Sequence, residues 1–202
     1  MTPDPSAGTA PSWREVLRAS SKTAHAVLDH ALEPAASSRG DYTRLIQVLH
    51  ALHAEADPLL ARWVGTSPVV RHLRAPDRER ALAADLTALG AAPLAPIALG
   101  DLPTIAPGLL SDPAGIALLY VVAGSSLGAR VILRRLPDSI PNTAREGLTR
   151  AASAQSAALW SDLIPLLARP APPADAASAR DVCSCLFARI LERLDRVPAT
   201  SG

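Results

Sequence analysis

The sequence has 202 residues, of which 49% are hydrophobic and 19% are charged, and its formal net charge is +1. A chain of this length and apolar content can bury one substantial core, so we expect a single domain at residues 12–196 between disordered tails at 1–11 and 197–202. The near-neutral charge gives no broad electrostatic attraction to nucleic acid or to an anionic membrane. Residues 1–11 also lack the basic region and apolar core of a signal peptide.

Two further observations concern the cellular compartment. The longest strongly apolar run, residues 116–123, is far short of a membrane span. Cys183 and Cys185 are two positions apart, which places them about 200° apart around a helix and makes a disulfide between them difficult. We therefore expect free thiols and a cytoplasmic protein with no membrane partner.

The first half of the chain predicts two long helices. Ser12 and Glu15 have the spacing of a capping box that opens the first helix, and Pro34 ends it. Asp41 is predicted to cap a second, leucine-rich helix, which Pro58 should kink. A third helix is expected to begin at Pro76 and to end at a glycine, Gly90.

The second half of the chain continues this pattern. Residues 91–111 are rich in proline and show no periodicity, so they predict a long ordered loop without strands. Asp112 and Pro113 start the next helix, which ends before Pro137. One helix is then expected from Pro141 to about residue 167, and a last one over residues 176–196. The chain is predicted to be an all-α, single-domain helical bundle.

The helix that follows Pro113 contains two glycines four positions apart, Gly124 and Gly128, with Ser125 and Ser126 between them. Glycine inside a helix costs up to about 1 kcal/mol relative to alanine, and this spacing places both glycines on one face. Such a face indicates either close packing of another helix or the approach of the backbone to a flat or bulky ligand. The serines can bond back to the preceding turn.

The first helix carries a polar stripe of Arg18, Lys22, His25 and Asp29, spaced four, three and four positions apart. An imidazole with cations one and two turns upstream suits a metalloporphyrin, because neutral histidine ligates iron and cations meet the propionates. The alternative is a histidine on an ordinary charged surface.

Together these segments resemble the heme oxygenase family, in particular its bacterial, biliverdin-producing branch. The stretch from Lys22 to His25 resembles the proximal helix of that family, and residues 119–128, which end in Gly-Ser-Ser-Leu-Gly, resemble its distal motif. Residues 80–90 and Trp160 also occur in family-like positions. The resemblance covers about residues 12–195 and implies a heme oxygenase-like fold.

The resemblance implies O2- and reductant-dependent cleavage of heme to biliverdin, carbon monoxide and ferrous iron, with heme as both cofactor and substrate. His25 would be the axial iron ligand, and Asp29 is the local candidate to hold its other ring nitrogen. Arg18, Lys22 and Arg130 would bind the propionates.

For the distal side, the resemblance implies that Gly124 and Gly128 let the backbone come close to bound oxygen, while Ser125 supports ordered water. The electron donor would be an external reductase or ferredoxin, since no flavin or nicotinamide motif is present. A photoreceptor that accepts biliverdin is a further implied partner.

The sequence departs from the family pattern at two positions. Ala123 stands where many bacterial members carry an acidic residue, and Ala129 stands where a second glycine is common. The main alternative is therefore a non-catalytic heme- or biliverdin-binding protein, or a regulatory partner, on the same scaffold. A helical interaction module that binds no tetrapyrrole is the third reading. A metal site at His50 and His53 lacks further ligands, and no Glu-x-x-His motif supports a di-iron centre.

Overall fold

The structure is a computed structural model that describes residues 10–32, 38–75 and 77–197. Helix α1 spans Trp13–Leu32 and begins with the expected capping box. The Glu15 carboxylate accepts a hydrogen bond from the Ser12 backbone N–H at 2.8 Å, and the Glu15 N–H donates to the Ser12 hydroxyl at 3.3 Å. Pro34 and most of the two predicted tails lie outside the described residues.

Helix α2 spans Arg39–Thr66 and contains Pro58. Its N-cap is Ser38 rather than the expected Asp41, because the Ser38 hydroxyl accepts the N–H of Asp41 at 3.0 Å. Helix α3 spans Glu79–Leu89 and ends at Gly90 as predicted, where a φ of 67° favours glycine. Pro76, its predicted start, lies outside the described residues.

The proline-rich stretch after α3 contains a small strand pair, which corrects the expectation of a strand-free loop. Strand β1, Thr104–Ala106, pairs antiparallel with β2, Leu109–Leu110. Gly108 lies in the turn between them with a φ of 68°, a conformation that glycine adopts without strain. Nothing in the sequence indicated these strands, because prolines interrupt the segment and β2 has only two residues. An alternation of apolar and polar residues cannot be recognised over so short a stretch.

Helix α4 spans Asp112–Leu133, close to the prediction, with Ser111 rather than Asp112 at the N-cap. By length and composition this helix is apolar enough to cross a membrane. The apolar run at residues 116–123 is only a part of it and was too short to indicate this. Half of that window is buried inside the protein, and α4 packs against α2, α5, α6 and α7, as a core helix does.

The single helix expected after Pro141 is in fact three pieces: a 3₁₀ turn over Asn142–Ala144, α5 over Glu146–Ala151 and α6 over Ala154–Leu167. The Asp85 carboxylate accepts the N–H groups of Glu146 and Gly147, at 2.8 and 2.9 Å, and so caps α5. Ser153 caps α6 through the N–H of Ser156. These caps explain the breaks, and the one on α5 comes from a distant segment.

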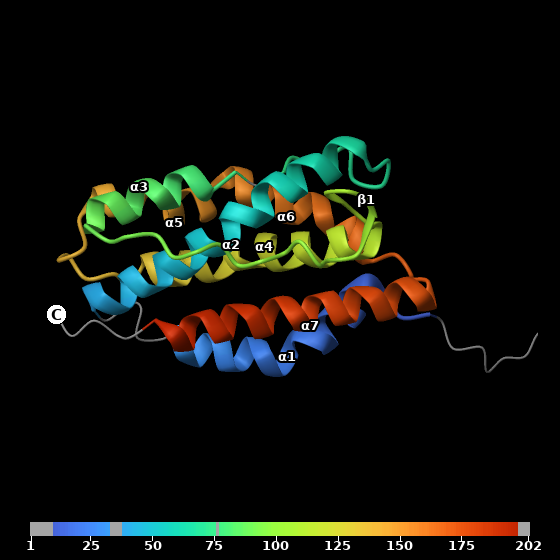
Figure 1. Ribbon diagram of the computed structural model, residues 1–202, viewed down its shortest axis with the longest axis horizontal. Helices are drawn as coiled ribbons and strands as arrows, with labels where there is room; N and C mark the ends of the chain where they lie inside the picture. Colours follow the sequence, from blue (N-terminus) through green and yellow to red (C-terminus); the bar gives the residue numbers. More distant parts are fainter. Residues whose placement is uncertain (1–9, 33–37, 76, 198–202) are drawn as a thin grey trace, which may run out of the picture.

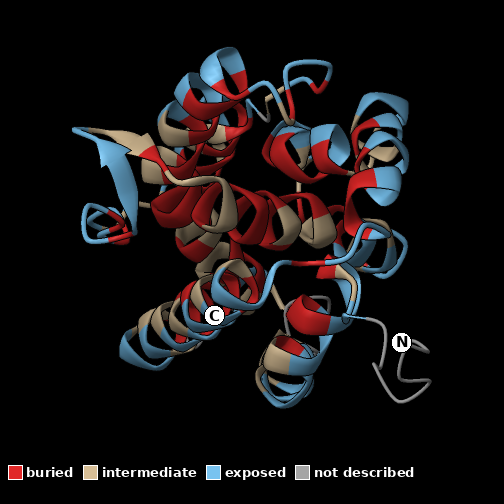
Figure 2. Cartoon of the chain, turned by 90° about the vertical axis from the view of Figure 1, so that its right-hand side faces the viewer, coloured by how far each residue is buried: buried red, intermediate tan, exposed pale blue. Residues whose placement is uncertain are grey.

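The last helix, α7, spans Pro173–Arg196 and packs along α1 and α4. Figure 1 shows α1 and α7 along one long side of the molecule, α3, α5 and α6 along the other, and α4 between them. Helix α2 crosses from the middle of the view to the upper side. Buried ribbon concentrates in the centre and exposed ribbon on the outer helix faces (Figure 2). The described residues thus form an all-α architecture, as predicted, apart from the strand pair.

Candidate functional site

A cavity of about 620 Å³ lies between α1 and α4, and its floor and walls come from α2, α5, α6 and α7. We call it the main cavity. Its volume falls in the range of about 300–1,000 Å³ that is typical of small-molecule sites. The polar and glycine residues that line it are Arg14, Arg18, Ser21, Lys22, His25, Asp29, Tyr120, Gly124, Ser125 and Gly128. Most of the rest of the lining is apolar, including Leu45, Val48, Leu52, Trp160, Phe187 and Ile190.

On the α1 side, His25 is held by its helix neighbour Asp29. The His25 Nδ1 atom lies 3.0 Å from Oδ2 of Asp29, one turn further along the helix. A carboxylate accepts hydrogen bonds, so this contact selects the neutral tautomer with its proton on Nδ1, in which Nε2 carries the lone pair. The His25 ring also lies 5.8 Å from the ring of Phe187 on α7. An imidazole oriented in this way is a suitable metal ligand.

Three cations follow the same face of α1 toward its N-terminus: Arg14, Arg18 and Lys22. All three are exposed and all three line the main cavity. Within the described residues none of them makes an ion pair. This rim of the cavity therefore favours an anionic group such as a carboxylate.

On the α4 side, the two glycines face the main cavity rather than a neighbouring helix. A Cβ atom at Gly128 would meet no described atom within 4 Å, and one at Gly124 would meet only Cζ3 of Trp160, at 3.8 Å. Gly115 in the same helix differs, because its Cβ would lie 2.2 Å from the Trp63 ring. Close helix packing thus explains Gly115, whereas Gly124 and Gly128 leave a smooth backbone wall beside open space.

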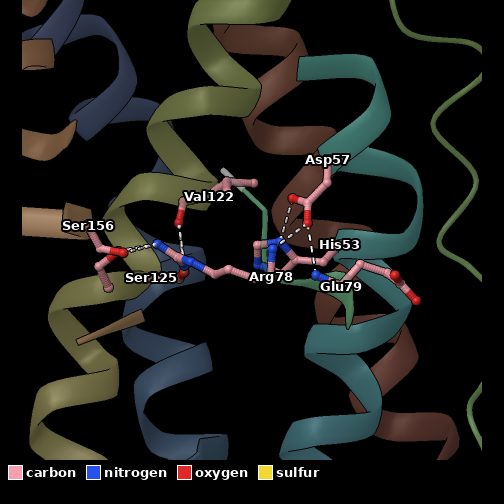
Figure 3. Close-up of polar contacts among 8 residues, drawn as sticks. His53, Asp57, Arg78, Glu79, Val122, Ser125 and Ser156 are labelled. Carbon is pink, nitrogen blue, oxygen red and sulfur yellow. Dashed lines mark hydrogen bonds and ion pairs between the residues drawn. The ribbon is translucent and has the colours of Figure 1, made fainter. Parts of the chain in front are cut away.

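Behind this wall, Arg78 reaches from the start of α3 to the serines of α4 (Figure 3). Its guanidinium donates to the hydroxyls of Ser125 at 3.0 Å and Ser126 at 2.5 Å, and to the carbonyl of Val122 at 3.3 Å. The Ser125 hydroxyl itself donates to the Val122 carbonyl at 2.7 Å, so that serine does bond back to the preceding turn. Arg78 is 5% exposed, and its burial lowers its pKa to about 10 although the charge of Asp57 raises it.

The backbone of Arg78 is fixed by Asp57 on α2. The Asp57 carboxylate accepts the N–H groups of Arg78 and Glu79, at 2.8 and 2.9 Å, and contacts Nδ1 of His53 at 2.7 Å. Burial by itself raises the pKa of Asp57, but the His53 contact and the two N–H bonds outweigh it, so this pKa lies below its usual value. Asp57 stays ionised and caps α3.

The structure brings most of the sequence-predicted residues together. Arg18, Lys22, His25, Gly124, Ser125 and Gly128 all line the main cavity. Arg130 is not among the lining residues, because its guanidinium donates to the carbonyl of Ala152 at 3.3 Å. Cys183 and Cys185 are free thiols, as expected.

Sequence reasoning missed three residues of this region, Arg14, Asp57 and Arg78. Arg14 is one turn before Arg18, so an extension of the polar stripe would have found it. Asp57 lies four positions after His53 and contacts it, so this helical spacing is the signal that would have found it. Nothing in the sequence singled out Arg78, because its role depends on the fold bringing this residue, just before α3, to the distant serines of α4.

Known proteins provide one informative comparison. The chain is similar to the NO- and CO-bound heme oxygenase of Neisseria meningitidis, with a TM-score of 0.63 and 20% sequence identity. The match covers 94% of this chain and 95% of that one. The protein has a heme oxygenase fold. No family model matches the sequence, and no curated protein sequence matches it either.

Within this heme oxygenase-like fold, the residues of the main cavity fit a heme. The glycine wall provides room for a flat ring, since a Cβ at Gly128 would project into open space. His25 offers a free ring nitrogen, and the α1 cations suit two propionates. The apolar lining residues suit a porphyrin face.

Proposed function

We propose that this protein is a heme oxygenase, which cleaves heme to biliverdin, carbon monoxide and ferrous iron. The observation that carries the proposal is that one cavity is flanked by the oriented His25 of α1 and by two helix glycines of α4 that no neighbouring helix requires. The fold likeness adds support, because it extends over nearly the whole chain.

Each lining group has a task in this proposal. His25 would hold the iron through Nε2, while Asp29 would keep the proton on Nδ1 and orient the ring. Arg14, Arg18 and Lys22 bind the propionates at the rim. Arg130, which bonds to Ala152 instead, becomes a weaker candidate for that role.

When bound, heme supplies both the redox-active iron and the ring that is cleaved, with dioxygen as oxidant and an external reductase or ferredoxin as electron donor. Gly124 and Gly128 would let the α4 backbone, with no side chain in between, form the wall of the main cavity that faces the bound group. The Ser125 hydroxyl donates a hydrogen bond to the Val122 carbonyl and accepts one from the Arg78 guanidinium. Its second oxygen lone pair is therefore left to accept a hydrogen bond from a water in the cavity. This serine thus orients water by accepting a hydrogen bond.

The test is an absorption time course of the purified protein with hemin, followed by ascorbate in air. We expect a sharp Soret band that decays into a broad red biliverdin band. A Soret band that persists would contradict turnover and would favour the non-catalytic heme- or biliverdin-binding alternative, with Ala123 and Ala129 as the first positions to restore. Absence of any Soret shift would contradict heme binding altogether.

A pair of histidine variants makes this test specific. His25→Ala should remove the low-spin hemin spectrum, because the proposed ligand is lost. His72→Ala is the matched control, since His72 is exposed and does not line the main cavity. Equal spectra for the two variants would refute His25 as the ligand. Delivery of biliverdin to a photoreceptor, and a cytoplasmic location, complete the proposal.

A further inference from the structure

The imidazole of His25 has a second neighbour besides Asp29. Its ring centroid lies 5.8 Å from that of Phe187, a residue of α7, and the two ring planes are tilted by 45°. Aromatic rings that attract one another lie about 4.5–7 Å apart, in tilted or offset arrangements. The two rings are therefore within contact range across the boundary between α1 and α7.

The hydrogen bond between His25 and Asp29 leaves the plane of the imidazole unrestrained. It fixes the position of Nδ1, but the ring can still turn about this bond, because the χ2 angle of histidine has only a broad preference. Both side chains are also more than half exposed, so water competes for the hydrogen bond. A metal ligand must be held within about 10–20° of its productive orientation. A ligand role for His25 therefore requires a second restraint on the ring plane.

Phe187 has the burial and the anchoring that this task needs. It is 4% exposed and belongs to the hydrophobic core, so its own side chain is held by packing. Its helix packs along α1, and Figure 1 shows the two helices side by side. Phe187, Ile190 and Leu194 form an apolar stripe of α7 that lines the main cavity. The ring of Phe187 is thus anchored in the core and reaches the cavity next to His25.

The chemistry of phenylalanine also suits the task. Its ring has no conventional hydrogen-bonding group, so it can restrain the imidazole without competing for Nε2. Only 3% of the sequence is aromatic, yet both ring pairs of the described residues lie at the main cavity. They are His25 with Phe187, and Tyr120 with Trp160 at 5.9 Å. The few aromatic contacts of this chain are thus concentrated at the candidate site.

We propose that Phe187 is a positioning residue for His25, which fixes the plane of the imidazole while Asp29 fixes its tautomer. The ring is then held from two sides, once by its own helix and once by α7. The consequence for an iron ligand rests on the proposed function. The restraint itself belongs to the folded chain, so it can be measured without hemin.

The first measurement is NMR spectroscopy of the hemin-free, full-length protein. The sequence contains one phenylalanine, so the signals of its ring can be assigned without ambiguity. We expect nuclear Overhauser contacts between the ring protons of Phe187 and those of His25. Their absence from the wild-type protein would overturn the proposal, and this result does not depend on the folding of any variant.

Substitutions of Phe187 then test the restraint. In Phe187→Leu the His25 ring protons should move toward the signals of an unrestrained histidine, because the ring current of phenylalanine is lost. Phe187→Tyr keeps an aromatic ring and should retain the wild-type signals. Ile190→Val is the matched control, since it trims another α7 residue of the main cavity but removes no ring. Equal His25 signals in the wild-type protein and in Phe187→Leu would overturn the proposal.

The same variants test the consequence for hemin. Phe187→Leu should weaken hemin binding about two- to tenfold, as the loss of one aromatic contact implies. In the cyanide complex it should also change the hyperfine shifts of the heme methyl groups, which depend on the plane of the axial imidazole. Phe187→Tyr and Ile190→Val should keep the wild-type shifts. Unchanged shifts in Phe187→Leu would mean that Phe187 only fills space, and would overturn its positioning role. Failure of the proposed function is distinct, because the wild-type protein would then show no Soret shift while the ring contact measured without hemin would persist.

Discussion

The Nδ1 atom of His25 and the Oδ2 atom of Asp29 lie 3.0 Å apart on one face of α1. Their side chains are 55% and 69% exposed, so the pair adds little to the stability of the helix. Its effect is on the imidazole, because the carboxylate selects the tautomer and fixes the ring relative to the main cavity. The pair is thus a feature of the site rather than of the fold.

Asp29→Asn should weaken hemin binding by about 10- to 100-fold while the free energy of unfolding stays nearly unchanged. An amide is a weaker acceptor than a carboxylate, so the histidine is less firmly oriented and less basic. Hemin titration with thermal unfolding of the hemin-free protein measures both. Asp181→Asn, at an exposed position of α7 outside the main cavity, is the control, and equal hemin affinity in both variants would contradict this role.

The α1 cations should recognise the charge of the propionates rather than the porphyrin ring. We expect the double variant Arg18→Gln, Lys22→Gln to lose at least tenfold in affinity for hemin, and to bind hemin dimethyl ester as the wild-type protein does. Arg180→Gln, an exposed change on α7, should affect neither ligand. A parallel loss for the ester and the acid would mean that these side chains support the fold instead.

Local signals in the sequence were sufficient for most of the architecture. The capping box at Ser12 starts α1 and the left-handed Gly90 ends α3 where the sequence pattern indicated. Both signals act within their own helix, so they can be recognised without knowledge of the fold. The stripe on α1 and the glycines of α4, which spacing and the family resemblance assigned to one site, line the same cavity, and their role in a heme site stays a prediction.

The parts that sequence reasoning missed depend on contacts between distant segments. Asp85 breaks the helix expected after Pro141, and it caps α5 across more than sixty residues of chain. Arg78 became a central residue only because the chain just before α3 brings its guanidinium to the serines of α4. Neither contact has a periodic signature, so no helix or strand pattern could reveal it.

Asp85 also predicts an unusual dependence of stability on pH. Its burial raises its pKa from 3.8 to about 6, against the effect of the two backbone hydrogen bonds that it accepts. Between these two values the folded protein holds a proton that the unfolded chain has lost, so the contribution of Asp85 to stability falls as the pH rises. Asp57 acts in the opposite direction, because its pKa is lowered in the folded protein. It stabilises the fold at pH values above the pKa of an ordinary aspartate, and this contribution is lost as the pH falls.

The measurement is urea unfolding of the wild-type protein and of Asp85→Asn at about pH 4 and about pH 7. Relative to the variant, the wild-type protein should lose up to about 3 kcal/mol of unfolding free energy between these two pH values. This is the loss implied by a pKa of Asp85 that rises from 3.8 to about 6 on folding. The comparison cancels the contribution of Asp57, which is present in both proteins. A difference that does not change with pH would show that Asp85 titrates normally.

Two glycine-to-alanine changes in α4 should have opposite effects on stability. At Gly128 a methyl group meets open space, so alanine should stabilise the helix by about 0.5–1 kcal/mol and raise the melting temperature by about 1–4 °C. At Gly115 the same methyl group would lie 2.2 Å from the Trp63 ring, and overpacking should cost about 1–3 kcal/mol. Thermal unfolding of the hemin-free variants measures both.

Gly128→Phe should then occupy the main cavity and abolish the hemin Soret shift in a folded protein. If Gly128→Ala is destabilising instead, that glycine packs against another part of the chain and the open wall described above does not exist.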